Sequence, residues 1–145
     1  MKTKPMETWM LFALLSMVFA GVTAVLAKYG LESINADLGL MIRTFIIFAL
    51  VVFMGFRENT FADFSQLTPK TIAFLVASGI TAYLSWVYYF RALKEGLVSY
   101  VAAIDKGSIV VTLALSFLLL KEPLKPQVLI GAGLVLSGLL VLIWK

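Results

Sequence analysis

Three ionisable side chains lie inside long apolar stretches of this sequence: Arg43, Asp105 and Lys106. An ionised group in the hydrocarbon of a membrane costs at least about 2.5 to 3.5 kcal/mol unless it faces protein or water. Each of these groups therefore needs a partner or a function. A guanidinium binds anionic groups, whereas a carboxylate binds cations or carries a proton. We take the three residues as the first candidates for a functional site.

The composition leaves little room for enzyme chemistry. The chain contains no cysteine and no histidine. This removes thiol nucleophiles, Cys/His metal sites and the usual general base. We therefore expect a protein that is not an enzyme and that has no cofactor and no metal ion.

Five apolar stretches position the candidate residues. Each holds roughly 17 to 20 residues, enough at about 1.5 Å per residue to cross a hydrocarbon core of about 30 Å. The chain is 61% hydrophobic and 14% charged, which is too apolar for a soluble domain of this length. The sequence predicts an all-α polytopic membrane helix bundle with five transmembrane helices. The stretches run over Trp9–Ala27, Leu38–Phe56, Ile72–Phe90, Val101–Leu120 and Val128–Trp144.

The positive charge is spread over the ends of these stretches. The net charge of +4 comes from single Lys and Arg residues, a pattern typical of contact with lipid headgroups, and we expect no nucleic-acid partner. Six Lys/Arg fall on the side of the N-terminus and four on the other side, which favours a cytoplasmic N-terminus only weakly. The balance leaves open that copies insert both ways and pair antiparallel. The six are Lys2, Lys4, Arg57, Lys70, Lys121 and Lys125; the four are Lys28, Arg91, Lys94 and Lys145.

The fourth stretch carries a polar stripe. Asp105, Ser108, Thr112 and Ser116 are spaced i, i+3, i+7 and i+11, so a continuous helix places them on one face. The stripe either lines a cavity or bonds its own helix and neighbouring helices. Lys106 lies about 100° round the helix from Asp105, so it need not share the partner of Asp105, and its stem can reach the membrane surface.

Arg43 and Asp105 are expected at similar depth, because the second and fourth stretches run in the same direction. Either residue then pairs with the other or binds a substrate; the alternative is an ion pair that only fixes helix packing. In the third stretch Tyr83 and Trp86 are candidates for apolar walls of a substrate pocket, although an interfacial aromatic belt explains Trp86 equally well. Small residues in the fifth stretch, among them Gly133 and Ser137, suit a contact between helices, including that of a dimer.

Several of these segments together resemble a known family. Trp86–Ser99, Val101–Lys106 and the Glu122-Pro123 turn before the Gly-rich last stretch are similar to the repeat of the EamA-like drug/metabolite transporter superfamily, as is Arg43 early in the second stretch. The resemblance covers nearly the whole chain, and it implies one EamA-like five-helix domain over residues 1–145. Many members resemble two such repeats fused in inverted orientation, whereas this chain resembles one repeat.

The resemblance implies a secondary transporter in the plasma (inner) membrane of a prokaryote. It would move a small metabolite or drug-like solute by alternating access, as an antiparallel homodimer embedded in the lipid bilayer. The expected substrate contacts are Arg43, Tyr83, Trp86, Asp105, Lys106, Ser108 and Thr112. The alternatives are a flippase for lipids or lipid-linked sugars and an accessory membrane subunit that does not transport. Unlike the four-helix multidrug exporters of the superfamily, the first stretch has no acid, which puts proton antiport in doubt.

Overall fold

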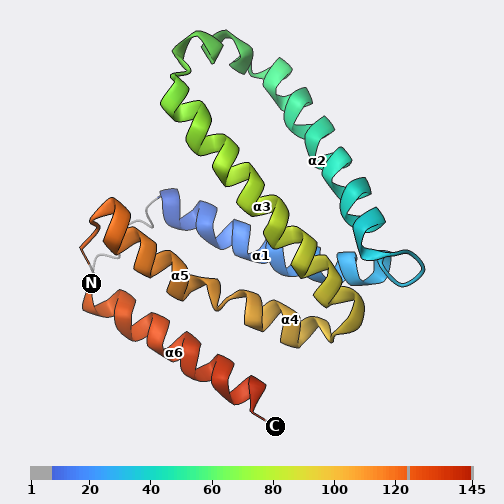
Figure 1. The fold of residues 1–145 in the computed structure, drawn as a ribbon, viewed down its shortest axis with the longest axis vertical. Helices are drawn as coiled ribbons and strands as arrows, with labels where there is room; N and C mark the ends of the chain where they lie inside the picture. The colour runs from blue at the N-terminus through green and yellow to red at the C-terminus, as the bar shows by residue number, and fades with distance from the viewer. Residues whose placement is uncertain (1–7, 124, 145) are drawn as a thin grey trace, which may run out of the picture. The chain divides into compact units, whose positions relative to one another are not determined.

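The computed structural model of the protein describes residues 8–123 and 125–144. Within these residues the chain forms helices and turns and no strand. Five helical segments are long and apolar enough to cross a membrane, which confirms the predicted all-α membrane fold (Figure 1). The segments are Thr8–Gly30, Ala36–Arg57, Pro69–Glu95, Val98–Leu120 and Pro126–Ile143.

The chain divides into two compact units. The first, here called the hairpin unit, covers residues 27–95 and holds the end of α1 (Thr8–Gly30), α2 (Ala36–Arg57), the short helix η1 (Thr60–Gln66) and α3 (Pro69–Glu95). The second, the terminal unit, covers residues 1–26 and 96–145. Its later elements are α4 (Val98–Asp105), α5 (Ser108–Leu115), the π-helical turn η2 (Ser116–Leu120) and α6 (Pro126–Ile143). The single domain expected over residues 1–145 stays a prediction.

Short polar signals set the ends of α2 and α3 in the hairpin unit. The Asn35 side chain accepts a hydrogen bond of 2.7 Å from the Leu38 amide and so caps the start of α2. Asn59 lies directly before η1 in the left-handed conformation, at φ 54°, and turns the chain between α2 and η1. The Thr68 hydroxyl accepts from the Thr71 amide at 3.2 Å at the start of α3. These caps let α2 and α3 pack side by side as an antiparallel pair joined through η1 (Figure 1).

The buried centre of the hairpin unit lies at the end where α1 and α3 finish and α2 begins. Leu31 and Leu93 are 1% and 0% exposed, and Leu40 and Phe90 are buried with them. Two lysines close this end. Lys28 donates to the Leu93 carbonyl at 2.7 Å, and Lys94 donates to the Glu32 carbonyl at 3.1 Å and to that of Leu31.

The fourth membrane segment, in the terminal unit, is not one continuous α-helix. α4 ends at Asp105, and α5 begins at Ser108. At the break the Gly107 amide donates to the Ile104 carbonyl at 2.9 Å, and the Val110 amide donates to the Gly107 carbonyl at 3.1 Å. These bonds span three residues and form a tight 3₁₀-type turn. The predicted fourth span is present, but the constant 100° per residue assumed for its polar stripe does not hold across Lys106–Gly107.

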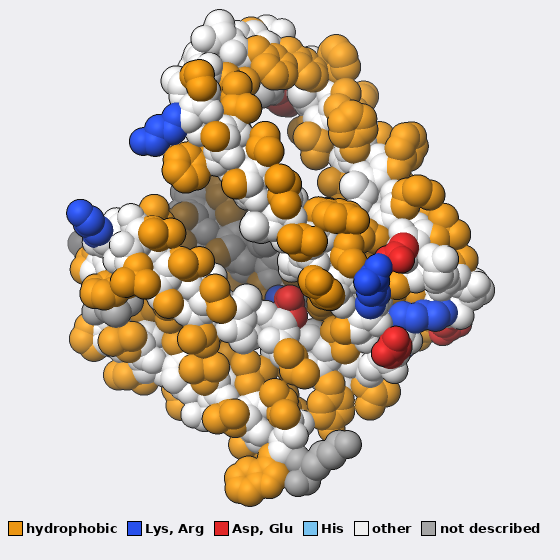
Figure 2. All heavy atoms as spheres, in the orientation of Figure 1, with side chains coloured by type: hydrophobic (Ala, Val, Ile, Leu, Met, Phe, Trp, Pro, Cys, Tyr) orange, Lys and Arg blue, Asp and Glu red, His pale blue; other side chains and the backbone are white. Residues whose placement is uncertain are grey.

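Apolar side chains cover most of the face shown in Figure 2. Charged side chains gather near the loop between α1 and α2, at the closed end of the hairpin unit (Figure 2). Among the described residues no polar or charged residue is buried. A surface of this kind suits lipid, which covers apolar side chains without cost.

Candidate substrate-contact site

Arg43 is held against aromatic rings towards the closed end of the hairpin unit. Its guanidinium carbon lies 4.5 Å from the centroid of the Trp86 ring and 5.4 Å from that of Phe90. Arg43 comes from α2 and the two rings from α3, and Arg43 and Trp86 are half-buried. Cation–π attraction of this kind is worth about 0.5 to 2 kcal/mol and orients the guanidinium without neutralising it. We call these three residues the Arg43 cluster.

No described carboxylate of the hairpin unit neutralises Arg43. The two ion pairs that arginines form in this unit join Arg57 to Glu58 at 3.8 Å and Arg91 to Asp37 at 3.2 Å. A cation–π contact gives the N–H groups of a guanidinium no oxygen acceptor, so these donors can still bind an anionic group. Within its unit, Arg43 thus carries a positive charge that the two rings hold in place and that can bind an anion.

A groove runs between α2 and α3 and has a volume of about 680 Å³. This is within the range of about 300 to 1,000 Å³ that small-molecule sites occupy. Tyr83, a predicted pocket wall, lines the groove. The whole lining consists of Asp37, Leu40, Met41, Thr44, Phe45, Phe48, Tyr83, Val87 and Arg91. We call this feature the α2–α3 groove.

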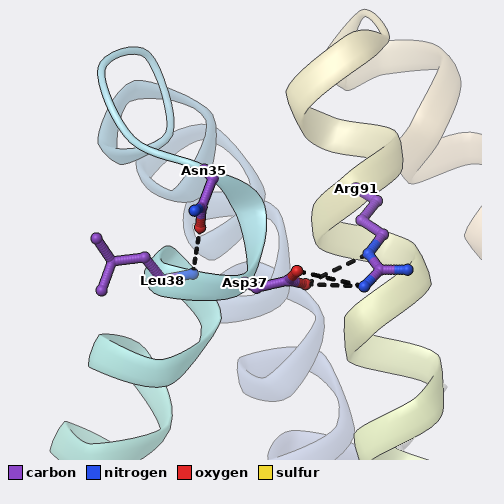
Figure 3. A network of polar contacts seen from close by, with 4 residues as sticks. All are labelled: Asn35, Asp37, Leu38 and Arg91. Atoms are coloured by element: carbon purple, nitrogen blue, oxygen red, sulfur yellow. Dashed lines mark hydrogen bonds and ion pairs between the residues drawn. The ribbon is translucent and has the colours of Figure 1, made fainter.

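An ion pair stands at one end of this groove. The Arg91 guanidinium donates to the Asp37 carboxylate through Nε at 3.3 Å and through Nη2 at 3.2 and 3.3 Å (Figure 3). Both residues lie near helix ends, Asp37 in the first turn of α2 and Arg91 in the last part of α3. Both side chains are more than half exposed. The pair is therefore accessible and able to exchange partners with a charged ligand.

The predicted polar residues of the terminal unit lie at the break in the fourth segment. The Asp105 carboxylate and the Lys106 ammonium are 3.3 Å apart, so neighbours in sequence pair with one another. Ser108 and Thr112 are exposed on α5.

Their hydroxyls differ from others in the chain. Thr81 donates to the Ala77 carbonyl at 3.1 Å, and Ser137 donates to that of Gly133 at 2.8 Å, so these hydroxyls are satisfied by their own helices. No such bond joins Ser108 or Thr112 to the rest of the described chain. Their hydrogen-bonding capacity is available for a solute or a neighbouring helix.

The predicted site residues thus form two local groups. Arg43 and Trp86 lie together, and Tyr83 lines the neighbouring groove. Asp105 pairs with Lys106 on another unit. The ion pair expected between Arg43 and Asp105 stays a prediction, because the two residues belong to different units.

The sequence analysis missed Asp37, Arg91 and the role of Phe90. It placed the first two in connections, whereas the structure places them on α2 and α3. The signal was present, because Asn35 followed by Asp37 is a helix start and an antiparallel hairpin brings the start of one helix to the end of the next. Among the described residues no three potential metal ligands gather, so we assign no residue to a metal.

A comparison with known families identifies the chain. The family model described as the EamA-like transporter family matches residues 7–144. The chain belongs to the EamA-like transporter family. It is therefore a multi-pass membrane protein of a transporter family, and this membership suggests a protein that is not an enzyme.

Two relatives of this EamA-like chain match along nearly their whole length. An uncharacterized transporter in the cobO 3' region of Sinorhizobium sp. is 37% identical over 136 residues, which cover 94% of this chain and 96% of that protein. An uncharacterized protein of Methanocaldococcus jannaschii is 26% identical over 138 residues, which cover 94% of this chain and 97% of that protein. No solved structure matches the chain significantly.

Proposed function

We propose that this EamA-like protein is a secondary transporter that moves a small metabolite or drug-like solute with an anionic group by alternating access. The observation that carries the proposal is the Arg43 cluster. A guanidinium in a membrane segment, held on the Trp86 ring at 4.5 Å and without a carboxylate partner within its unit, is a costly arrangement unless it binds something. A solute anion would supply the missing charge.

The other predicted residues have complementary roles in this proposal. Tyr83 and Trp86 supply apolar walls, while Asp105 and Lys106 offer one charge of each sign. Ser108 and Thr112 supply hydroxyls that their own helix does not use. Discontinuous membrane helices with polar residues at the break are typical of transporter binding sites, which supports a role for the turn at Lys106–Gly107.

We further propose that two copies work as an antiparallel homodimer in the plasma membrane of a prokaryote. The matches with the two relatives cover 94% of this chain and 96% and 97% of those proteins, so all three have similar lengths. An odd number of spans cannot supply an inverted repeat within one unit, so an inverted partner has to come from a second copy. The near-balance of six against four Lys/Arg permits insertion in both orientations.

The test is a flux assay with purified protein in proteoliposomes. Labelled amino acids, organic anions, amines and nucleobases are supplied one at a time, with empty liposomes as the blank. We expect flux of a solute that carries an anionic group, and loss of that flux in Arg43→Gln. The control is Arg57→Gln, which removes the same charge from an arginine that is more than half exposed on the same helix.

Two results would count against the proposal. One is that no solute crosses faster than in empty liposomes although the protein is folded. The other is that Arg43→Gln transports as well as Arg57→Gln, which would separate the Arg43 cluster from transport.

A further inference from the structure

We propose that the α2–α3 groove binds a membrane phospholipid whose headgroup carries both a phosphate and an ammonium group. The groove shares Tyr83 with the proposed substrate site, but the lipid proposal does not depend on transport. All of its lining residues belong to the hairpin unit. Three observations support it: the length of the groove, its wall and the charges at its end.

The groove has the length of one leaflet of a bilayer. Its lining on α2 begins at Asp37, in the first turn of the helix, and extends to Phe48. Eleven steps at about 1.5 Å give roughly 16 Å, which is about half of a hydrocarbon core of about 30 Å. A lipid anchored by its headgroup at the helix end would therefore have its chain beside the apolar lining.

The wall suits a hydrocarbon chain. Met41, Phe45 and Phe48 of α2 are 63%, 71% and 64% exposed, and they face Tyr83 and Val87 of α3 across the groove. In a membrane an irregular gap of about 680 Å³ between helices has to be filled, because unfilled space loses van der Waals contacts. A flexible acyl chain fills such a gap and leaves no polar group unsatisfied.

The charges at the end select the headgroup. Asp37 and Arg91 are paired at 3.2 Å with exposed side chains, so each retains capacity for a further partner. Lys28 and Lys94 at the same end already donate to main-chain carbonyls. A headgroup with only a phosphate would meet the repulsion of Asp37, and one with only a cation would meet that of Arg91. A headgroup with both groups complements both residues.

The experiment is native mass spectrometry of the full chain in mild detergent with added phosphatidylethanolamine. We expect one bound lipid per chain that survives collisional activation. Removing both charges with Asp37→Asn and Arg91→Gln should weaken binding roughly tenfold or more, since charge-assisted hydrogen bonds are lost. Thr44→Trp, which places an indole on the groove wall, should weaken it similarly.

The matched control is the double change Arg57→Gln and Glu58→Gln, which removes an ion pair of similar exposure outside the groove. It should bind lipid as the unchanged protein does. Variants are compared only when they are monodisperse and helical. Val87→Trp, on the opposite wall, replaces Thr44→Trp if that variant does not fold.

Four results would overturn the proposal. Equal retention of lipid by the groove variants and the control would show that the lipid binds elsewhere. Binding of phosphatidylglycerol as tight as that of phosphatidylethanolamine would remove the role of Asp37. Displacement of the lipid by free phosphoethanolamine at equal concentration would show a site for small zwitterions. A dimer that excludes lipid from the groove would identify a second copy of the chain as the occupant.

Discussion

The Lys28 side chain caps the end of the helix that carries Lys94, and the Lys94 side chain caps the chain just after the helix that carries Lys28. The Lys28 ammonium, from the end of α1, donates to the Leu93 and Lys94 carbonyls at 2.7 and 3.2 Å at the end of α3. The Lys94 ammonium donates to the Leu31 and Glu32 carbonyls that follow α1. Helix ends leave carbonyls without partners, and a cation there also complements the helix dipole. These reciprocal hydrogen bonds, here called the lysine clasp, join the end of α1 to the end of α3.

Removing one lysine of the clasp should destabilise the protein. Hydrogen bonds from a charged donor are worth about 1.5 to 3 kcal/mol, so we expect Lys28→Met to lower the free energy of unfolding by about that amount. The measurement is thermal unfolding in a fixed detergent, followed by circular dichroism. Lys70→Met, at the opposite end of α3 and exposed, is the control and should change little.

The two lysines should also be coupled. Both lysines join the end of α1 to the end of α3. The double change Lys28→Met and Lys94→Met should therefore lower the free energy of unfolding by less than the sum of the single changes. Strict additivity would show that each lysine caps its carbonyls independently.

Gly39 also matters for packing at the closed end of the hairpin unit. A Cβ placed at Gly39 would overlap Cδ2 of Leu31, which is 1% exposed and therefore has little room to move. We expect Gly39→Ala to lower the free energy of unfolding by about 1 to 3 kcal/mol through overpacking. Gly79→Ala is the matched change, because the added Cβ would meet nothing within 4 Å apart from its chain neighbours and its own helix backbone, and alanine favours the helix. If both variants melt alike, Leu31 adjusts without cost.

The partner of Arg43 can be identified by two double-mutant cycles in unfolding assays. Because the guanidinium lies 4.5 Å from the Trp86 ring, Arg43→Ala and Trp86→Ala should show a coupling of about 0.5 to 2 kcal/mol. Arg43→Lys should lose much of it, since the ammonium lacks the flat face that stacks on the ring. A cycle of Arg43→Ala with Asp105→Ala tests the ion pair predicted from the sequence. Zero coupling there would exclude that pair, and zero coupling with Trp86 would contradict the cluster.

The topology can be tested with single cysteines, because the chain has none of its own. Ser33 and Ser65 lie before and after α2, hence on opposite sides of the membrane if α2 crosses it. If copies insert both ways, Ser33→Cys and Ser65→Cys should each react with an impermeant thiol reagent in part of the population in intact cells. Labelling of one position alone would mean a single orientation and would rule out the antiparallel homodimer. Positions 2 and 145 lie outside the described residues, so the cysteines are placed at Ser33 and Ser65 instead.

The sequence by itself determined the class of the protein. Five apolar stretches of roughly 17 to 20 residues have the length of membrane-spanning helices and are too long for the strands of a membrane β-barrel, the other structure that bonds its whole backbone in lipid. The order of Trp86–Ser99, Val101–Lys106 and Glu122-Pro123 indicated the family, which the comparison confirmed. Arg43 and Trp86 were both predicted as site residues, because a charge and a large aromatic ring within apolar stretches can be read from the sequence without knowing which side chains they contact.

Only the tertiary structure decided which residues lie together. It placed Arg43 on the Trp86 and Phe90 rings and Asp105 beside Lys106, because side-chain partners depend on the rotation of each helix about its axis. It also broke the fourth segment at Lys106–Gly107, where three-residue hydrogen bonds replace those of the α-helix. The groove ending at Asp37 and Arg91 arises from the pairing of α2 with α3. A hydropathy pattern records how apolar a helix is but not which face meets which neighbour, and that choice is made by packing.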